Sequence, residues 1–306
     1  MRTYPRALRR RETALTAVAL AALLTVTLAG CGESAAPEAS APKRSARPSA
    51  PASADPSLHM VARDGRELAF HVTPGSLPAI VLDSGGGMDA SQWKEIVPAL
   101  AKATGSKIIT YDRAGMGESD EVVGAWSAEN AAADLAAGLA ELRVTRDVIL
   151  VAHSQGGEVA TYFADKNPKT LTGAVLVDAG LPGFYTDDEV ARLEAANKER
   201  IAQLEGKPST KEIRQLLATA DDFGPMHRAY HELSWPKGVP VTVMASSKTP
   251  FDVPEDAQLW RDAQAQFADA APDRELVVVE GSSHDIPADR PQSVVKAVED
   301  MVKAHS

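Results

Sequence analysis

Two kinds of hydrophobic spacing alternate along most of the chain after residue 57. Short apolar runs indicate buried strands, and longer stretches with an apolar residue every three or four positions indicate helices. The pattern opens with two runs, 58–62 and 67–72, on either side of Asp64-Gly65, a dipeptide typical of a hairpin turn. The opening segment is therefore predicted to be an antiparallel hairpin.

Strands and helices then alternate as far as the C-terminus. A hairpin followed by strand–helix repeats predicts an α/β fold, with a mostly parallel eight-stranded sheet and helices on both of its faces. Length does not require a second domain, because α/β folds often use this much chain as one. The further strands are expected at 79–83, 107–111, 147–151, 173–178, 239–245 and 276–279, and the helices at 89–103, 127–142, 158–165 and 292–302.

One stretch, residues 181–236, interrupts this alternation after the sixth strand. It contains two helix-like pieces, 187–204 and 209–220, that are rich in Glu, Lys and Gln. An insertion at this point would lie beside the carboxyl edge of the sheet, where α/β proteins bind ligands. We interpret 181–236 as a helical cap over a binding site. The alternative is a helical excursion without a role at the site.

The N-terminus follows neither spacing. Five arginines between residues 2 and 11 precede an uncharged, mostly apolar stretch, 13–29, which leads into Gly30 and Cys31. This arrangement resembles the signal peptide and lipobox of a bacterial lipoprotein. The resemblance implies removal of residues 1–30, lipidation of Cys31, and export to the outer face of the cell membrane with a lipid anchor. An uncleaved anchor or an ordinary signal peptide are the alternatives.

Residues 31–57 are rich in Ala, Pro and Ser and have no apolar periodicity, which predicts a disordered tether to a folded domain at 58–306. Cys31 is the only cysteine, so no intrachain disulfide can form.

The formal charge of −10 would become −14 after cleavage before Cys31, because five arginines and Glu12 would be lost. Such an acidic chain is not expected to bind nucleic acid, and a monomer is the default expectation.

The candidate chemistry begins at residues 152–156, Ala-His-Ser-Gln-Gly, between a predicted strand and a predicted helix. A serine on such a turn is held exposed at the end of the sheet, next to a helix N-terminus. The pentapeptide resembles the nucleophile elbow of the α/β-hydrolase superfamily, Gly-x-Ser-x-Gly, with Ala152 in place of the first glycine. The resemblance covers nearly all of residues 58–306 and implies that Ser154 is a nucleophile. An ordinary loop serine is the alternative.

His284 is the histidine best placed to act as the base for Ser154. It lies in Gly-Ser-Ser-His at 281–284, directly after the last predicted strand and therefore at the same sheet edge as the serine. The hydrolase superfamily has a similar Gly-x-x-His there, and the chain order of serine, acid and histidine also matches.

The acid is harder to assign from the sequence. Lys248 occupies the position after the seventh strand at which the superfamily usually has its aspartate. Some members use an acid at the end of the sixth strand instead, where this chain has Asp178. We favour Asp178, keep Asp252 as the alternative, and rank Asp285 third because it would have to fold back to reach the His284 ring.

The oxyanion hole is expected to contain the backbone N–H of Gln155 and one from the glycine loop at 83–88. Gly86 is our choice for the second donor and Gly87 the alternative; in this loop Ser84 replaces the histidine of the superfamily.

Residues 112–119, Asp-Arg-Ala-Gly-Met-Gly-Glu-Ser, also resemble a superfamily segment. We interpret them as structural, with Asp112 and Arg113 fixing a turn, because no Gly-Lys-Ser/Thr follows to bind phosphate.

The combined resemblance implies a serine hydrolase that cleaves a carboxylic ester, or a related acyl compound, through an acyl-enzyme. The small-molecule acyl substrate would need no cofactor, and the sequence contains no cluster with metal-ligand spacing. Amide, perhydrolase or C–C hydrolase chemistry on the same scaffold is one alternative. A non-catalytic binding or sensor protein is another, motivated by the displaced acid and by Ser84 in the glycine loop.

Overall fold

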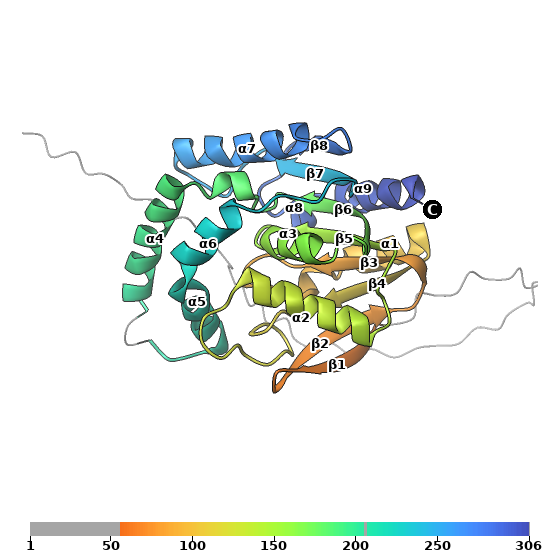
Figure 1. Ribbon diagram of the computed structural model, residues 1–306, viewed down its shortest axis with the longest axis horizontal. Helices are drawn as coiled ribbons and strands as arrows, with labels where there is room; N and C mark the ends of the chain where they lie inside the picture. The colour runs from red at the N-terminus through yellow and green to blue at the C-terminus, as the bar shows by residue number, and fades with distance from the viewer. Residues whose placement is uncertain (1–55, 205–206, 306) are drawn as a thin grey trace, which may run out of the picture.

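The computed structural model describes residues 56–204 and 207–305 (Figure 1). An eight-stranded sheet runs through its centre in the order β1-β2-β4-β3-β5-β6-β7-β8. β1 pairs antiparallel with β2 and β2 with β4, and every other neighbouring pair is parallel, so the predicted fold class is confirmed. The strands are β1 (Ser57–Arg63), β2 (Arg66–Thr73), β3 (Ser76–Asp83), β4 (Ser106–Tyr111), β5 (Val148–His153), β6 (Leu171–Val177), β7 (Val241–Ser246) and β8 (Arg274–Val279).

Helices cover both faces of the sheet because alternate residues of each central strand point to opposite sides. In β3, Val81 packs into one hydrophobic cluster, while Ile80 and Leu82 belong to the other. The first cluster includes residues of α2 (Ala128–Glu141), α3 (Gly156–Lys166) and α7 (Pro254–Asp269). The second includes residues of α1 (Ile96–Thr104), α8 (Ile286–Asp289) and α9 (Pro291–Ala304).

The segment between β6 and β7 forms three α-helices where the sequence pattern predicted two. They follow a short 3-10 helix, η2 (Pro182–Phe184), and are α4 (Asp187–Ala202), α5 (Lys211–Asp221) and α6 (Phe223–His231). The third helix was not predicted because it is short and has Gly224 and Pro225 in its first turn. In Figure 1 the three helices lie to the left of the sheet. Lys211 on α5 donates to the carbonyl oxygens of Gly117 and Ser119 at 2.8 Å, which ties this segment to the sheet domain.

Two other segments differ from the hydrophobic pattern. The stretch predicted as one helix at 89–103 is a 3-10 helix, η1 (Ala90–Trp93), followed by α1, with Asp89 capping η1 through the N–H of Ser91. Helix α7 was not identified, because two of its six buried residues, Asp256 and Gln264, are polar and three others are alanines, which leaves a weak apolar stripe. No helix among the described residues is long and apolar enough to cross a membrane.

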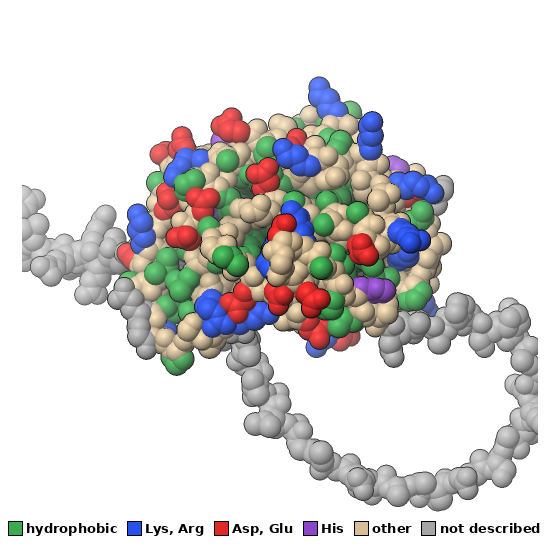
Figure 2. All heavy atoms as spheres, turned by 60° about the horizontal axis from the view of Figure 1, so that its bottom comes forward, with side chains coloured by type: hydrophobic (Ala, Val, Ile, Leu, Met, Phe, Trp, Pro, Cys, Tyr) green, Lys and Arg blue, Asp and Glu red, His purple; other side chains and the backbone are tan. Residues whose placement is uncertain are grey.

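The predicted signal peptide, the lipidation site at Cys31 and nearly all of the predicted tether lie outside the described residues. β1 begins at Ser57, the last residue assigned to the tether. On the face shown in Figure 2, acidic and basic side chains lie among one another without a continuous basic surface.

Candidate active site

Ser154 occupies the tight turn between β5 and α3, at the carboxyl edge of the sheet. Its φ of 53° is in the left-handed region, which non-glycine residues adopt only when the surroundings enforce it. The backbone N–H groups of Gly157 and Gly180 both donate to the Ser154 carbonyl oxygen at 2.9 Å and hold the turn. A Cβ on Gly157 would come within 2.6 Å of the Ala179 side chain, so a glycine is needed for α3 to pack this closely.

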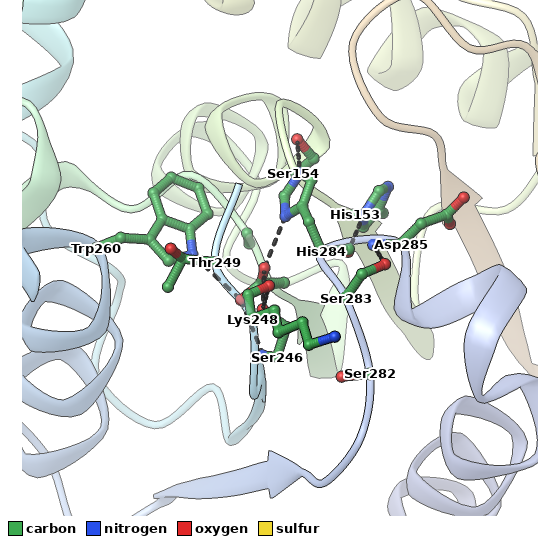
Figure 3. A network of polar contacts seen from close by, with 12 residues as sticks. His153, Ser154, Ser246, Lys248, Thr249, Trp260, Ser282, Ser283, His284 and Asp285 are labelled. Carbon is green, nitrogen blue, oxygen red and sulfur yellow. Dashed lines mark hydrogen bonds and ion pairs between the residues drawn. The ribbon is translucent and has the colours of Figure 1, made fainter. Parts of the chain in front are cut away.

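A chain of two hydrogen bonds joins Ser154 to an aspartate (Figure 3). Ser154 Oγ lies 2.9 Å from His284 Nε2, and His284 Nδ1 lies 2.6 Å from Asp178 Oδ2. A carboxylate accepts, so Nδ1 carries the proton, and Nε2 is left as the acceptor for the serine hydroxyl. The imidazole is therefore held in the tautomer that a general base requires.

Asp178 follows β6 directly, and its side chain is 1% exposed. Besides His284, its carboxylate accepts the backbone N–H of Ser246 at 3.0 Å, the Ser246 hydroxyl at 2.8 Å and the indole N–H of Trp260 at 3.1 Å. Four donors compensate the carboxylate for the water it loses on burial. Its φ of 41° turns the chain sharply at the strand end.

Of the three candidate acids, Asp178 is the one that the structure places against the His284 ring. Asp252 is exposed in the loop between β7 and α7. Asp285 caps α8 by accepting the N–H of Ala288 at 3.3 Å. Lys248, at the usual acid position, brings its carbonyl oxygen within 2.8 Å of Ser246 Oγ, where it competes with Asp178 for the single hydroxyl proton.

The glycine loop after β3 faces Ser154 and is held from behind by Arg113. The buried guanidinium donates to Asp83 Oδ1 at 2.6 Å, to the Gly85 carbonyl oxygen at 2.6 Å, and to the Ser84 carbonyl oxygen. These bonds turn the carbonyl groups of Ser84 and Gly85 toward Arg113. Arg113 was expected to fix its own turn, and its contacts with the glycine loop were not foreseen.

Near Ser154, the backbone N–H groups of Gly86, Gly87 and Gln155 donate to no acceptor among residues 56–204 and 207–305. Gly85 N–H, in contrast, donates to Gln92 Oε1 at 2.8 Å. Gly86 is half-buried and Gly87 exposed, and both line the cavity beside Ser154. This geometry is compatible with either glycine as the second oxyanion donor.

A cavity of about 460 Å³ opens at Ser154 and His284. The helices between β6 and β7 form one wall of it, with Leu193 from α4, Leu216 from α5 and Phe223 from α6. The segment predicted as a cap therefore borders the site. Apolar side chains elsewhere in the wall are Met88, Met116, Trp126, Phe184, Phe251 and Trp260, and the charged residues Glu158, Arg200 and Asp285 also line the cavity.

One group of side chains in the described part of the chain could hold a metal ion: the ligand atoms of His71, Asp112 and Glu118 lie within 4.8 Å of one another. Both Asp112 oxygens are already engaged, Oδ1 by the N–H of Ala90 at 2.8 Å and Oδ2 by the N–H of Glu118 at 2.9 Å. His71 lies 3.4 Å from Oδ2, and this contact raises its pKa. The hydrogen bonds fit the structural role expected for Asp112.

Sequence reasoning missed two residues that contact the proposed acid, Ser246 and Trp260. Ser246 ends β7, so its position at the same sheet edge as Asp178 was a usable signal. Trp260 offered none, because it reaches Asp178 from the middle of α7, a helix that the pattern did not identify.

A serine on a strained strand–helix turn, linked to histidine and aspartate beside an apolar cavity, defines a nucleophile–base–acid arrangement on an α/β sheet. The profile of the alpha/beta hydrolase family matches residues 80–297, and the chain belongs to this family.

Curated relatives include proteins with and without an assigned activity. The uncharacterized protein YqjL of Bacillus subtilis is 24% identical over 72% of this chain and 82% of its own length. A non-heme haloperoxidase of Rhodococcus erythropolis is 36% identical over 40% of this chain and 44% of its own length. Because the chain spans less than half of the haloperoxidase, that likeness covers only part of the relative.

Solved structures share the fold at lower identity. A thermophilic esterase from Thermogutta terrifontis superimposes with a TM-score of 0.56 at 23% identity, covering 82% of this chain and 100% of the esterase. A bromoperoxidase from Bacillus anthracis gives a TM-score of 0.62 at 18% identity, with 81% and 100% coverage. At these identities the likeness establishes the architecture alone.

Proposed function

We propose that the protein is a serine hydrolase that cleaves carboxylic esters through an acyl-enzyme. The observation that carries the proposal is the continuous hydrogen-bond chain from Ser154 Oγ through His284 to Asp178. A serine hydroxyl is a weak nucleophile until an adjacent base takes its proton, and this chain supplies the base and its orienting acid.

In the proposed reaction, His284 Nε2 takes the proton of Ser154 as Oγ attacks the ester carbonyl carbon. Asp178 stabilises the imidazolium that results. The N–H groups of Gln155 and Gly86 donate to the oxyanion of the tetrahedral intermediate, and loss of one such donor typically costs about 3 kcal/mol. His284 then protonates the leaving alcohol as the ester C–O bond breaks. Water attacks the acyl carbon with His284 again as the base, and the acyl–Oγ bond breaks as His284 returns the proton to Ser154, which releases the carboxylic acid.

The cavity supports an uncharged, largely apolar acyl substrate. Its volume of about 460 Å³ lies in the range of small-molecule sites, and many of the side chains that line it are aromatic or aliphatic. Short and medium acyl chains are therefore the proposed substrates.

Perhydrolase chemistry is a second candidate, favoured by the likeness to the Rhodococcus erythropolis non-heme haloperoxidase. The same acyl-enzyme would be attacked by hydrogen peroxide in place of water and would release a peracid. Ester hydrolysis with and without peroxide, followed by oxidation of a halide reporter, separates the two. The complete hydrogen-bond chain at Ser154 speaks against a purely binding role.

A fluorophosphonate probe tests the activated serine directly. The expected result is a single adduct, mapped by mass spectrometry to Ser154 and lost in Ser154→Ala and His284→Ala. A panel of p-nitrophenyl esters of increasing acyl length then measures turnover. A folded protein that neither reacts with the probe nor hydrolyses any ester would overturn the hydrolase proposal.

We further propose that the enzyme is exported and anchored through lipidated Cys31. The arginine-rich start and apolar stretch before Cys31 support this proposal. Expression of wild type and Cys31→Ser in a bacterial host, followed by detergent phase partitioning, tests it. The wild type is expected in the detergent phase and the variant in the aqueous phase.

A further inference from the structure

A second chain of hydrogen bonds links the glycine loop to the backbone of His284. Gly85 N–H donates to Gln92 Oε1 at 2.8 Å, Gln92 Nε2 lies 2.8 Å from His153 Nδ1, and His153 Nε2 lies 3.0 Å from the His284 carbonyl oxygen. His153 is the residue before Ser154, and Figure 3 shows its ring beside His284. The two imidazole rings are 4.9 Å apart.

The direction of every bond in this chain is determined by its two ends. Gly85 N–H can only donate, so the atom of Gln92 that faces it is the amide oxygen, and the amide NH₂ faces His153. An NH₂ group can only donate, so His153 Nδ1 accepts and the imidazole proton is on Nε2. The His284 carbonyl can only accept, which requires the same tautomer.

The geometry points to Gln92 and His153 as positioning residues that set the distance between the glycine loop and His284 through this directed hydrogen-bond chain. The inference rests on the proposed hydrolase function, since its consequence is the alignment of the base with both Ser154 and the oxyanion donor at Gly86.

Packing around His153 supports a fixed position. Its side chain is buried, and a Cβ on Gly85 would lie 2.8 Å from Nδ1, so the loop approaches the ring as closely as a glycine permits. Titratable groups that act on the ring are Asp178, Arg113 and His284. Burial and the neighbouring His284 lower the pKa of His153 to about 3, so the ring stays neutral and keeps the tautomer that the chain requires.

The chain also explains why the Gly85 N–H is not an oxyanion donor. Gln92 Oε1 occupies it, which leaves Gly86 as the first N–H in the loop without an acceptor among the described residues. Gln92 belongs to η1, so one short helix fixes the loop on one side and, through His153, the base on the other.

The test uses substitutions of matched length at the two positions. Glutamine at residue 153 places an amide N–H near the position of histidine Nε2, whereas methionine has the same reach and no donor. His153→Gln should keep kcat for p-nitrophenyl butanoate within about threefold of the wild type, and His153→Met should lower it at least tenfold, with KM within threefold in both. Gln92→Met should resemble His153→Met, and surface Gln292→Met is the control for an added methionine.

A spectroscopic readout makes the test independent of turnover. In histidine-labelled full-length protein, the short His284 Nδ1–H bond to Asp178 should give a low-field proton resonance. His153→Gln should keep this resonance, and His153→Met and Gln92→Met should lose it while circular dichroism shows an unchanged fold. If the wild type resists the fluorophosphonate probe but the resonances follow this pattern, the hydrolase function fails and the positioning chain stands.

Two outcomes would overturn the positioning role. In the first, the His153→Gln and His153→Met variants have the same kcat and the same low-field proton resonance. The other is Gln92→Met with wild-type kcat and an intact resonance. Because Gln92 is only half-buried, its variant is expected to fold even if His153→Met does not, and then decides the result alone.

Discussion

The indole N–H of Trp260 donates to Asp178 Oδ1 at 3.1 Å, and the face of the acid that His284 does not use is thereby occupied. The Trp260 ring also contacts His284 edge-on, with ring centroids 5.8 Å apart, and packs against Phe184 at 4.9 Å. One side chain from α7 therefore supports the acid, borders the base and forms part of the cavity wall.

Replacing this indole by a phenyl ring should reduce both activity and stability. Trp260→Phe keeps the aromatic packing but removes one donor from a buried carboxylate, where a hydrogen bond to a charged group is worth about 1.5–3 kcal/mol. We expect kcat/KM for a p-nitrophenyl ester to fall roughly tenfold, which corresponds to about 1.4 kcal/mol. Steady-state kinetics and thermal melting measure both effects. Wild-type kcat/KM in the variant would mean that Ser246 and His284 suffice to hold Asp178.

The choice between the two candidate acids gives a matched pair of variants. Asp178→Asn should lower kcat by about 10³-fold or more, because the amide no longer stabilises the imidazolium or fixes its tautomer. Asp252→Asn changes an exposed loop carboxylate and should leave kcat within twofold. Ester hydrolysis by both variants, after active-site titration of each preparation, provides the comparison. A severe loss in Asp252→Asn would require a loop conformation other than the one described.

The architecture and the chain order of the site could be predicted because both are encoded locally. The apolar run before Ser154, the small residues around it, and the loop position of His284 each depend on a few adjacent residues. Asp178 could only be favoured over Asp252, because the choice depends on which strand end reaches the His284 ring. Gln92 acts through side-chain hydrogen bonds across distant segments, which hydrophobic periodicity does not record.

Arg113 connects buried charge to the shape of the glycine loop. Burial raises the pKa of Asp83, and the guanidinium at 2.6 Å opposes this shift by stabilising the carboxylate. Arg113→Met would leave Asp83 buried without its partner and should lower the free energy of unfolding by about 3 kcal/mol or more. Arg113→Lys keeps the charge but not the planar fork that contacts the loop, so it should lose less stability and still lower kcat about tenfold. Chemical denaturation and kinetics of both variants test this. An Arg113→Met protein as stable as the wild type would contradict it.

The buried neutral ring of His153 should also make stability depend on pH. Its pKa is about 3 in the folded protein, whereas an unfolded histidine has a pKa near 6.5. The unfolded state therefore binds a proton as the pH falls below 6.5 and the folded state does not, so stability present above pH 6.5 is lost progressively toward pH 3. Between pH 7 and pH 5 this loss should be about 2 kcal/mol from His153 alone. His153→Gln removes the titrating group and keeps the other histidines, so its free energy of unfolding should fall by about 2 kcal/mol less than that of the wild type over the same interval. Urea unfolding of the two proteins at pH 7 and pH 5 measures the difference, and parallel losses would show that His153 gains a proton in the folded state.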